Sequence, residues 1–249
     1  ISFFLLLSIV TSSEIFVFVI VVVTAIVTYY SLIKCVKQEY AALFGTVIYM
    51  LAPYRLYNFY NRAAIGECLA MCFLPLVVCG MYRLFTENVT GESYKYAKIP
   101  LIVGLSCVLQ SHMLSCEMAV LGIVGVCVIA YKKTFRKETF MQLAQAAVIC
   151  LLLNMWFWLP LLQMMFSDQY KLGNIIVQEI QYKGTLFAEV FQLYPNKGGV
   201  QDGMYNAEPF QMGIASLIML IVGLGISIYQ WIKREKCDKR LLFWGGIVI

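Results

Sequence analysis

The chain has 249 residues, of which 61% are hydrophobic and only 13% are charged, and its mean hydropathy is +0.77. Soluble domains carry charge on about a quarter of their residues. The composition therefore excludes an ordinary soluble enzyme and indicates a multi-pass membrane protein. The net charge of +5 does not indicate nucleic-acid binding, because the basic residues are concentrated in particular loops.

Apolar stretches alternate with polar segments along the chain. A helix needs about 20 apolar residues to cross a bilayer, or fewer if neighbouring helices shield it. In chain order we predict the end of a span at Ile1–Val10, then Ile15–Val36, a short span at Tyr40–Ala52, and Ala64–Tyr82 with a kink at Pro75. A hairpin of Ile99–Gln110 and Met113–Tyr131 follows, then Phe140–Gln163, Phe210–Ile232 and the start of a span at Leu241–Ile249.

These spans predict an all-α fold, a polytopic transmembrane helix bundle that forms one domain over residues 1–249. The sequence starts without a methionine and stops inside an apolar run, so we expect it to be part of a longer protein. Ile1–Val10 is not a signal peptide, because it has no basic region and no small-residue cleavage site before Glu14.

Basic residues are unevenly distributed between the two sets of loops that alternating spans define. One set holds 14 of the 19 basic residues and, with the flanking Glu39 and Glu138, 6 of the 14 acidic ones. It comprises Lys34 and Lys37, the Arg83–Lys98 loop, Lys132–Lys137 and Lys233–Arg240. The positive-inside rule places these loops in the cytoplasm. Residues 52–67, His112–Glu117 and the polar segment at about 167–209 are then extracytoplasmic, in a multi-pass protein of the cell membrane.

The sequence contains nine cysteines. Most of them lie inside predicted spans, and none forms a CxxC pair. We therefore interpret them as small helix residues rather than as a disulfide scaffold or a metal site.

The stretch Ala52–Glu67, APYRLYNFYNRAAIGE, places an unusual number of polar and aromatic residues between two apolar segments. If residues 52–62 are helical, Arg55, Asn58 and Arg62 share one face. Paired guanidinium groups suit phosphate oxygens, and Tyr54, Tyr57 and Tyr60 are suited to stacking on a sugar. The alternative is an ordinary interfacial belt of aromatic and basic residues.

Glu67 stands at the start of an apolar span, where an ionised carboxylate needs a partner. Arg62 is five residues earlier, so the two side chains would point apart on a straight helix. Either the helix breaks near Gly66, or Glu67 pairs with another element.

His112 is the only histidine, and it lies at the tip of the predicted hairpin, with Glu117 close behind it. An ionisable residue at membrane depth is a functional candidate, although a lone histidine also commonly has a structural role. No metal site is predicted, and no cofactor is detectable, because zinc, P-loop, dinucleotide and nucleophile-elbow motifs are absent from the sequence. For the carboxylates of residues 167–209, a solvated lid is the default interpretation.

The chain contains three consecutive short runs, Leu51-Ala52-Pro53-Tyr54-Arg55-Leu56-Tyr57, Asn61-Arg62-Ala63-Ala64-Ile65-Gly66-Glu67 and Phe73-Leu74-Pro75-Leu76, and later Ser111-His112. In these residues it resembles a bacterial membrane family with the pattern SPYRLxDxYxRGAxGExxAxxxLPL. In that family a Ser-His hairpin follows the pattern, and Ser111-His112 matches it here. That family carries the label 6-pyruvoyl-tetrahydropterin-synthase-related. The chain is more distantly similar to YfhO-type proteins and to GT-C polyprenyl-phosphate-sugar transferases. The match covers Leu51 to Glu117, with Ala63-Ala64 in place of the usual Gly-Ala and with Asn58 or Asn61 where relatives often have an acid.

The resemblance implies a GT-C-like bundle that uses a polyprenyl-phosphate-linked sugar at the outer face of the membrane to modify a cell-envelope glycan or lipid. Its substrate-binding residues would be Tyr54, Arg55, Tyr57, Asn58, Tyr60 and Arg62, and its catalytic candidates Glu67, His112 and Glu117. It also implies a catalytic acid in a loop that precedes Ile1. The alternatives are a transporter or flippase for a lipid-linked or anionic substrate, and a non-catalytic membrane protein. The partners expected in each case are membrane lipids.

Overall fold

The computed structural model describes residues 2–166 and 214–232, and every regular element in these ranges is helical. The prediction of an all-α fold is confirmed to that extent. Within these ranges, two helical segments, Glu14–Val36 and Ile65–Thr86, are long and apolar enough to cross a membrane, and a bent pair described below makes a third if it counts as one span. The predicted segments at 167–209 and Leu241–Ile249 lie outside the described residues.

The chain divides into two compact units. The first comprises residues 1–51 and 58–158, and the second comprises residues 52–57 and 159–249. The second unit contains α3 (Pro53–Tyr57), the later part of α9 (Met155–Phe166) and α11 (Ile214–Ile232). The helix α11 matches the predicted Phe210–Ile232 span in its described part.

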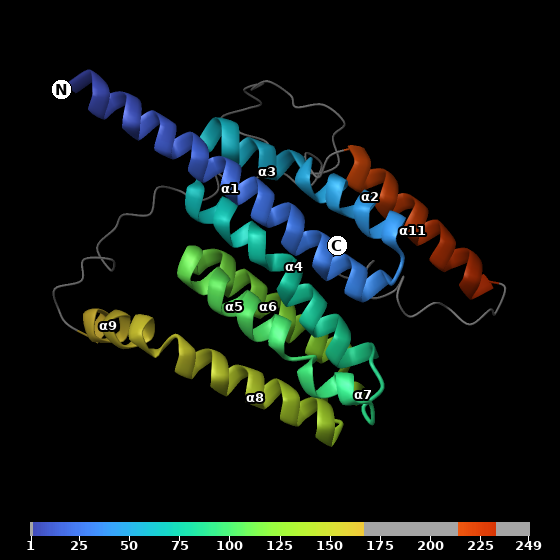
Figure 1. Cartoon of the computed structure of the whole chain (residues 1–249). Helices are drawn as coiled ribbons and strands as arrows, with labels where there is room; N and C mark the ends of the chain where they lie inside the picture. The colour runs from blue at the N-terminus through green and yellow to red at the C-terminus, as the bar shows by residue number, and fades with distance from the viewer. Residues whose placement is uncertain (1, 167–213, 233–249) are drawn as a thin grey trace, which may run out of the picture. The chain divides into compact units, whose positions relative to one another are not determined.

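The first unit is a stack of helices with α4 (Ile65–Thr86) at its centre (Figure 1). The helix α1 (Ser2–Val36) packs on one side of α4, and α2 (Glu39–Met50) packs on α1. On the other side α5 (Ile99–Ser111) contacts α4, and α6 (Met113–Ile129) and α8 (Lys137–Leu153) contact α5. Short elements complete the unit: η1 (Asn58–Arg62), η2 (Glu92–Tyr96) and α7 (Tyr131–Thr134).

Small residues allow the helices of this core to approach closely, as is usual for helices packed within membranes. A Cβ atom added to Gly80 of α4 would lie 2.5 Å from the backbone nitrogen of Leu101 in α5, and one added to Gly104 would lie 2.8 Å from that of Val77. On the other side of α4, the buried Thr24 of α1 is 2.8 Å from the Cys72 sulfur. The eight cysteines in the described residues are free thiols on helices or at their ends, as we predicted for this residue type.

One predicted element boundary is wrong, and one predicted span is bent. The polar run Thr11–Glu14 does not separate two spans, because α1 is one helix of 35 residues; that run contains no proline or glycine that would break the helix. The predicted span Phe140–Gln163 is bent, since α8 and α9 meet at Asn154 at an angle of 69°. The Asn154 amide nitrogen donates to the Cys150 carbonyl oxygen at 2.7 Å, which competes with the regular helical pattern.

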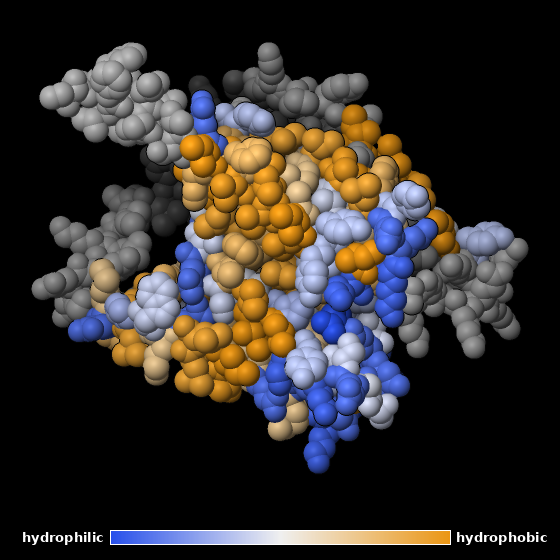
Figure 2. All heavy atoms as spheres, in the orientation of Figure 1, coloured by the Kyte–Doolittle hydropathy of each residue, from blue (hydrophilic) through white to orange (hydrophobic). Residues whose placement is uncertain are grey.

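The surface of the first unit is largely apolar outside its ends. Leu114, Met118, Leu121 and Val128 of α6 are each more than 60% exposed, which is expected of a face that contacts lipid. Hydrophilic side chains gather where α4 ends and α7 begins, while hydrophobic ones cover much of the rest of the visible face (Figure 2). We call this hydrophilic region the basic end, and define it by Lys34, Lys37, Arg83 and Lys133. Lys133 connects to α4 by donating to the Phe85 carbonyl oxygen at 2.7 Å.

Candidate functional site

Residues 53–62 are helical, but the turn after residue 57 is a π-helix, η1, and not a continuation of the α-helix α3. Its five-residue spacing widens the helix, and such turns are frequent at functional sites. The chain leaves η1 through a wide turn in which the Ala64 amide donates to the Asn58 carbonyl oxygen at 3.0 Å. Helix α4 then starts at Ile65, so the break between Arg62 and Glu67 occurs at Ala63–Ala64 rather than at Gly66.

This break brings three polar side chains together, which we call the Asn58–Arg62–Glu67 cluster. Arg62 Nη1 donates to Asn58 Oδ1 at 3.0 Å and lies 3.2 Å from Glu67 Oε2. The Asn58 amide nitrogen donates to the same Glu67 oxygen at 3.0 Å. Each side chain therefore contacts the other two. The Glu67 carboxylate, which the sequence predicts to need a partner, has two: the Arg62 guanidinium group and the Asn58 amide.

The three side chains of the cluster differ in solvent exposure. Asn58 is fully buried, the Glu67 side chain is 15% exposed and the Arg62 side chain is 35% exposed. Burial of the amide holds the carboxylate in place, because a buried polar group requires its hydrogen bonds. The guanidinium group is thus the member that is most accessible to a ligand.

The turn at Ala63 is strained. Its φ of 48° lies in the left-handed region, which a residue with a Cβ atom adopts at a cost of about 1 kcal/mol. We expect Ala63→Gly to stabilise the protein by about 0.5 kcal/mol, since glycine relieves this strain but loses more backbone entropy on folding. Ala64→Gly is the matched control: its φ is −79°, so the substitution should lower stability. Equilibrium unfolding in mixed detergent micelles measures both, and a loss of stability in Ala63→Gly would contradict the expectation.

The hairpin tip lies next to the cluster, at the start of α4. A Cβ atom on Gly66 would lie 3.0 Å from the Ser111 carbonyl oxygen and 3.6 Å from His112 Cδ2. His112 caps α6, because its Nδ1 accepts from the Ser115 backbone amide at 3.2 Å. Nδ1 also lies 2.8 Å from the Ser115 hydroxyl. Of the two roles considered for His112, catalytic and structural, these contacts support the structural one.

The remaining candidates differ in their exposure. Glu117 is on an exposed position of α6 and has no hydrogen bond or ion pair within the described ranges. Tyr60 is 84% exposed, as a residue of an interfacial belt would be. In the second unit Tyr54 is exposed, Tyr57 is half-buried and Arg55 is buried, with 3% of its surface accessible. The expectation that Arg55 shares a face with Arg62 stays a prediction.

Two polar groups were not singled out from the sequence. Asn154 is fully buried at the α8–α9 bend, where its Oδ1 accepts from Gln110 at 2.7 Å and its Nδ2 donates to Ser106 Oγ at 2.9 Å. At the basic end, Arg83 forms an ion pair with Glu87 at 2.6 Å. The sequence could have predicted the Arg83–Glu87 ion pair, because an arginine and a glutamate four residues apart at the end of an apolar helix lie on the same face. Asn154 could have been found as the one side-chain amide in the otherwise apolar stretch of residues 146–162.

Known proteins offer no comparison for this arrangement: no protein-family model, curated protein or solved structure matches the chain.

Proposed function

We propose that the chain is part of a GT-C-like glycosyltransferase, which takes a sugar from a polyprenyl-phosphate donor at the extracytoplasmic face of a bacterial membrane. The acceptor would be a cell-envelope glycan or lipid. The observation that supports this proposal most strongly is the Asn58–Arg62–Glu67 cluster, which places an oriented and partly exposed guanidinium group at the start of a membrane-length helix.

The role proposed for Arg62 is electrostatic. When the glycosidic bond to the donor phosphate breaks, negative charge develops on the phosphate, and a pre-oriented cation stabilises it without having to reorganise. Glu67 accepts from both Arg62 and Asn58 through one oxygen, so its proposed role is to position Arg62 rather than to act as the base. The base would then come from a residue outside this cluster. In this proposal Tyr60 contacts the sugar, and the roles that the sequence suggested for Arg55 as a phosphate ligand and for Tyr57 on the sugar stay predictions.

The experiment measures binding of a short-chain polyprenyl phosphate to the purified protein, together with sugar transfer from the corresponding phospho-sugar. Arg62→Lys keeps the charge but loses the planar group that contacts both Asn58 and Glu67. We expect transfer to fall about 100-fold, as when one oriented donor is lost from a catalytic site, while expression and folding remain normal.

Arg136→Lys is the control, because Arg136 is exposed at the other end of the unit and has no side-chain partner in the described part of the chain. It should behave as the unaltered protein. Full transfer by Arg62→Lys would refute the role proposed for Arg62. Absence of polyprenyl-phosphate binding in the unaltered protein would refute the proposed function as a whole.

The alternative function is transport of a lipid-linked or anionic substrate. The bend of 69° between α8 and α9, with the buried amide of Asn154 at the break, favours it, because transporters commonly bind substrates at interrupted helices. Movement of a fluorescent polyprenyl-phosphate lipid between the leaflets of a proteoliposome, without sugar transfer, would favour this function over the first.

A further inference from the structure

A cavity of about 340 Å³ opens at the basic end of the first unit, at the opposite end of α4 from the Asn58–Arg62–Glu67 cluster. Its walls come from the end of α1, the end of α4 and the loop that follows α4. The lining residues are Ile33, Lys34, Lys37, Arg83, Glu87, Asn88, Gly91 and Ser93. All of them belong to the first unit.

The charge of the cavity lining is unbalanced, because three cations face one carboxylate. Glu87 is engaged by Arg83, through Nε at 2.6 Å and Nη2 at 3.4 Å. Lys34 has only the Tyr30 ring, 5.6 Å from its ammonium nitrogen, and Lys37 has no acidic partner within the described part of the chain. The lining therefore carries a net positive charge of about two, which favours an anionic ligand.

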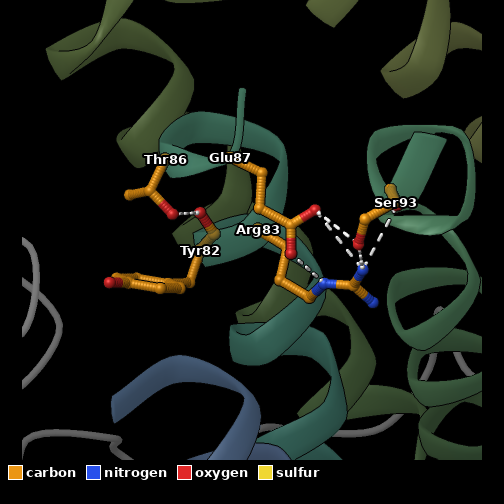
Figure 3. Close-up of polar contacts among 5 residues, drawn as sticks. All are labelled: Tyr82, Arg83, Thr86, Glu87 and Ser93. Carbon is orange, nitrogen blue, oxygen red and sulfur yellow. Dashed lines mark hydrogen bonds and ion pairs between the residues drawn. The ribbon is translucent and has the colours of Figure 1, made fainter. Parts of the chain in front are cut away.

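Arg83 is held in one orientation. The residue is only 9% exposed, and besides Glu87 its Nη2 donates to Ser93 Oγ at 3.0 Å and to the Ser93 carbonyl oxygen at 3.3 Å. Figure 3 shows the guanidinium group between these two partners, with its remaining nitrogen, Nη1, directed away from both. Nη1 has no hydrogen-bond partner among the described residues, so a fixed cation offers its donors to a ligand.

Lys37 has an unusual backbone for a residue with a long side chain. It follows α1 with a φ of 59°, and its amide donates to the Ile33 carbonyl oxygen at 3.0 Å. Glycine is the residue that this helix-ending position favours. A lysine here is therefore not explained by the fold, and its ammonium group is one of the cations that line the cavity.

We propose that this cavity is a binding site for a phosphate group. Arg83 supplies an oriented donor pair, and Lys34 and Lys37 supply flexible point charges, a combination typical of phosphate sites. The ligand is either the headgroup of an anionic phospholipid or a free phosphate compound. The cavity lies at the ends of the two membrane-length helices, at the depth where headgroups lie, and the charge distribution predicts that this is the cytoplasmic end, whose leaflet carries anionic lipids.

The test uses the full chain purified in detergent and native mass spectrometry with three probes: dihexanoyl phosphatidylglycerol, dihexanoyl phosphatidylcholine and inorganic phosphate. Each cation near a phosphate surface contributes about fivefold in affinity. We therefore expect Lys37→Gly to weaken phosphatidylglycerol binding about fivefold, and Lys34→Gln with Lys37→Gly to weaken it about 25-fold. Lys95→Gln, an exposed lysine of the same loop that does not line the cavity, is the matched control and should bind as the unaltered protein.

Lys37→Gly separates binding from folding, because glycine suits the backbone at this position. Its melting temperature should equal or exceed that of the unaltered protein while its affinity falls. Binding of phosphatidylglycerol alone supports a lipid headgroup as the ligand. Binding of inorganic phosphate with the same dependence on Lys34 and Lys37 supports a free phosphate compound. The proposal is overturned if neither anion binds, if phosphatidylcholine binds equally well, or if Lys95→Gln weakens binding as much as Lys37→Gly.

Discussion

Gly80→Ala should destabilise the protein by about 2 kcal/mol, because the added methyl group overpacks the contact between α4 and α5. Its Cβ atom would lie 2.5 Å from the Leu101 nitrogen and 2.6 Å from its Cβ. The nearest atoms include backbone, so a side-chain rotation does not relieve the clash and the two helices must move apart. Equilibrium unfolding in mixed micelles of mild detergent and SDS measures the loss.

Gly122→Ala is the control for this prediction. Gly122 also lies in a helix, α6, but a Cβ atom there would have no neighbour within 4 Å. The substitution should stabilise the protein by up to about 1 kcal/mol, since alanine favours the helix over glycine. Similar changes in the two variants would show that helix propensity, not the close approach of α4 and α5, governs Gly80.

Glu67→Ala should lower the free energy of unfolding by about 2 kcal/mol, because the substitution removes the acceptor of two hydrogen bonds. One donor, the Asn58 amide, is fully buried and cannot turn to water. The other donor, Arg62, is about one-third exposed, so its contribution is smaller than that of a buried ion pair. The same unfolding measurement applies.

Glu117→Ala is the matched control, since Glu117 is an exposed glutamate on α6 with no hydrogen bond or ion pair to another described residue. Its stability should change by less than about 0.5 kcal/mol, as for most surface substitutions. A double-mutant cycle of Arg62→Met and Glu67→Met then isolates the ion pair from the amide. A coupling energy near zero would contradict the cluster as a unit.

The two ends of the first unit differ in the way that their arginines are used. Arg62 pairs with a carboxylate five residues later, across a break in the helix, and Arg83 pairs with one four residues later, at the end of a regular helix. The first arrangement depends on the strained turn at Ala63, and the second on helix geometry alone. Substitutions that relax the turn at Ala63 are therefore informative about the first site and should not affect the second.

The helical class, the positions of most helices and the hairpin at Ser111-His112 could be predicted from the amino-acid sequence alone. These features follow from local properties, namely hydropathy over windows of membrane length and polar residues between them. The sequence also indicated that Arg62 and Glu67 cannot meet on one straight helix, and it left open whether the helix breaks near Gly66 or Glu67 pairs with another element.

The position of the break in the helix, and the groups that it brings together, could not be predicted and are seen in the folded chain. The π turn at Asn58 and the left-handed Ala63 have no signature in hydropathy, because they depend on how η1 closes onto the start of α4. The same is true of Gly66 beside His112, of Asn154 with Gln110, and of the cavity with Lys37 and Arg83. Each joins residues 10 or more positions apart, and contacts of that range follow from the packing of helices rather than from the pattern along any one of them.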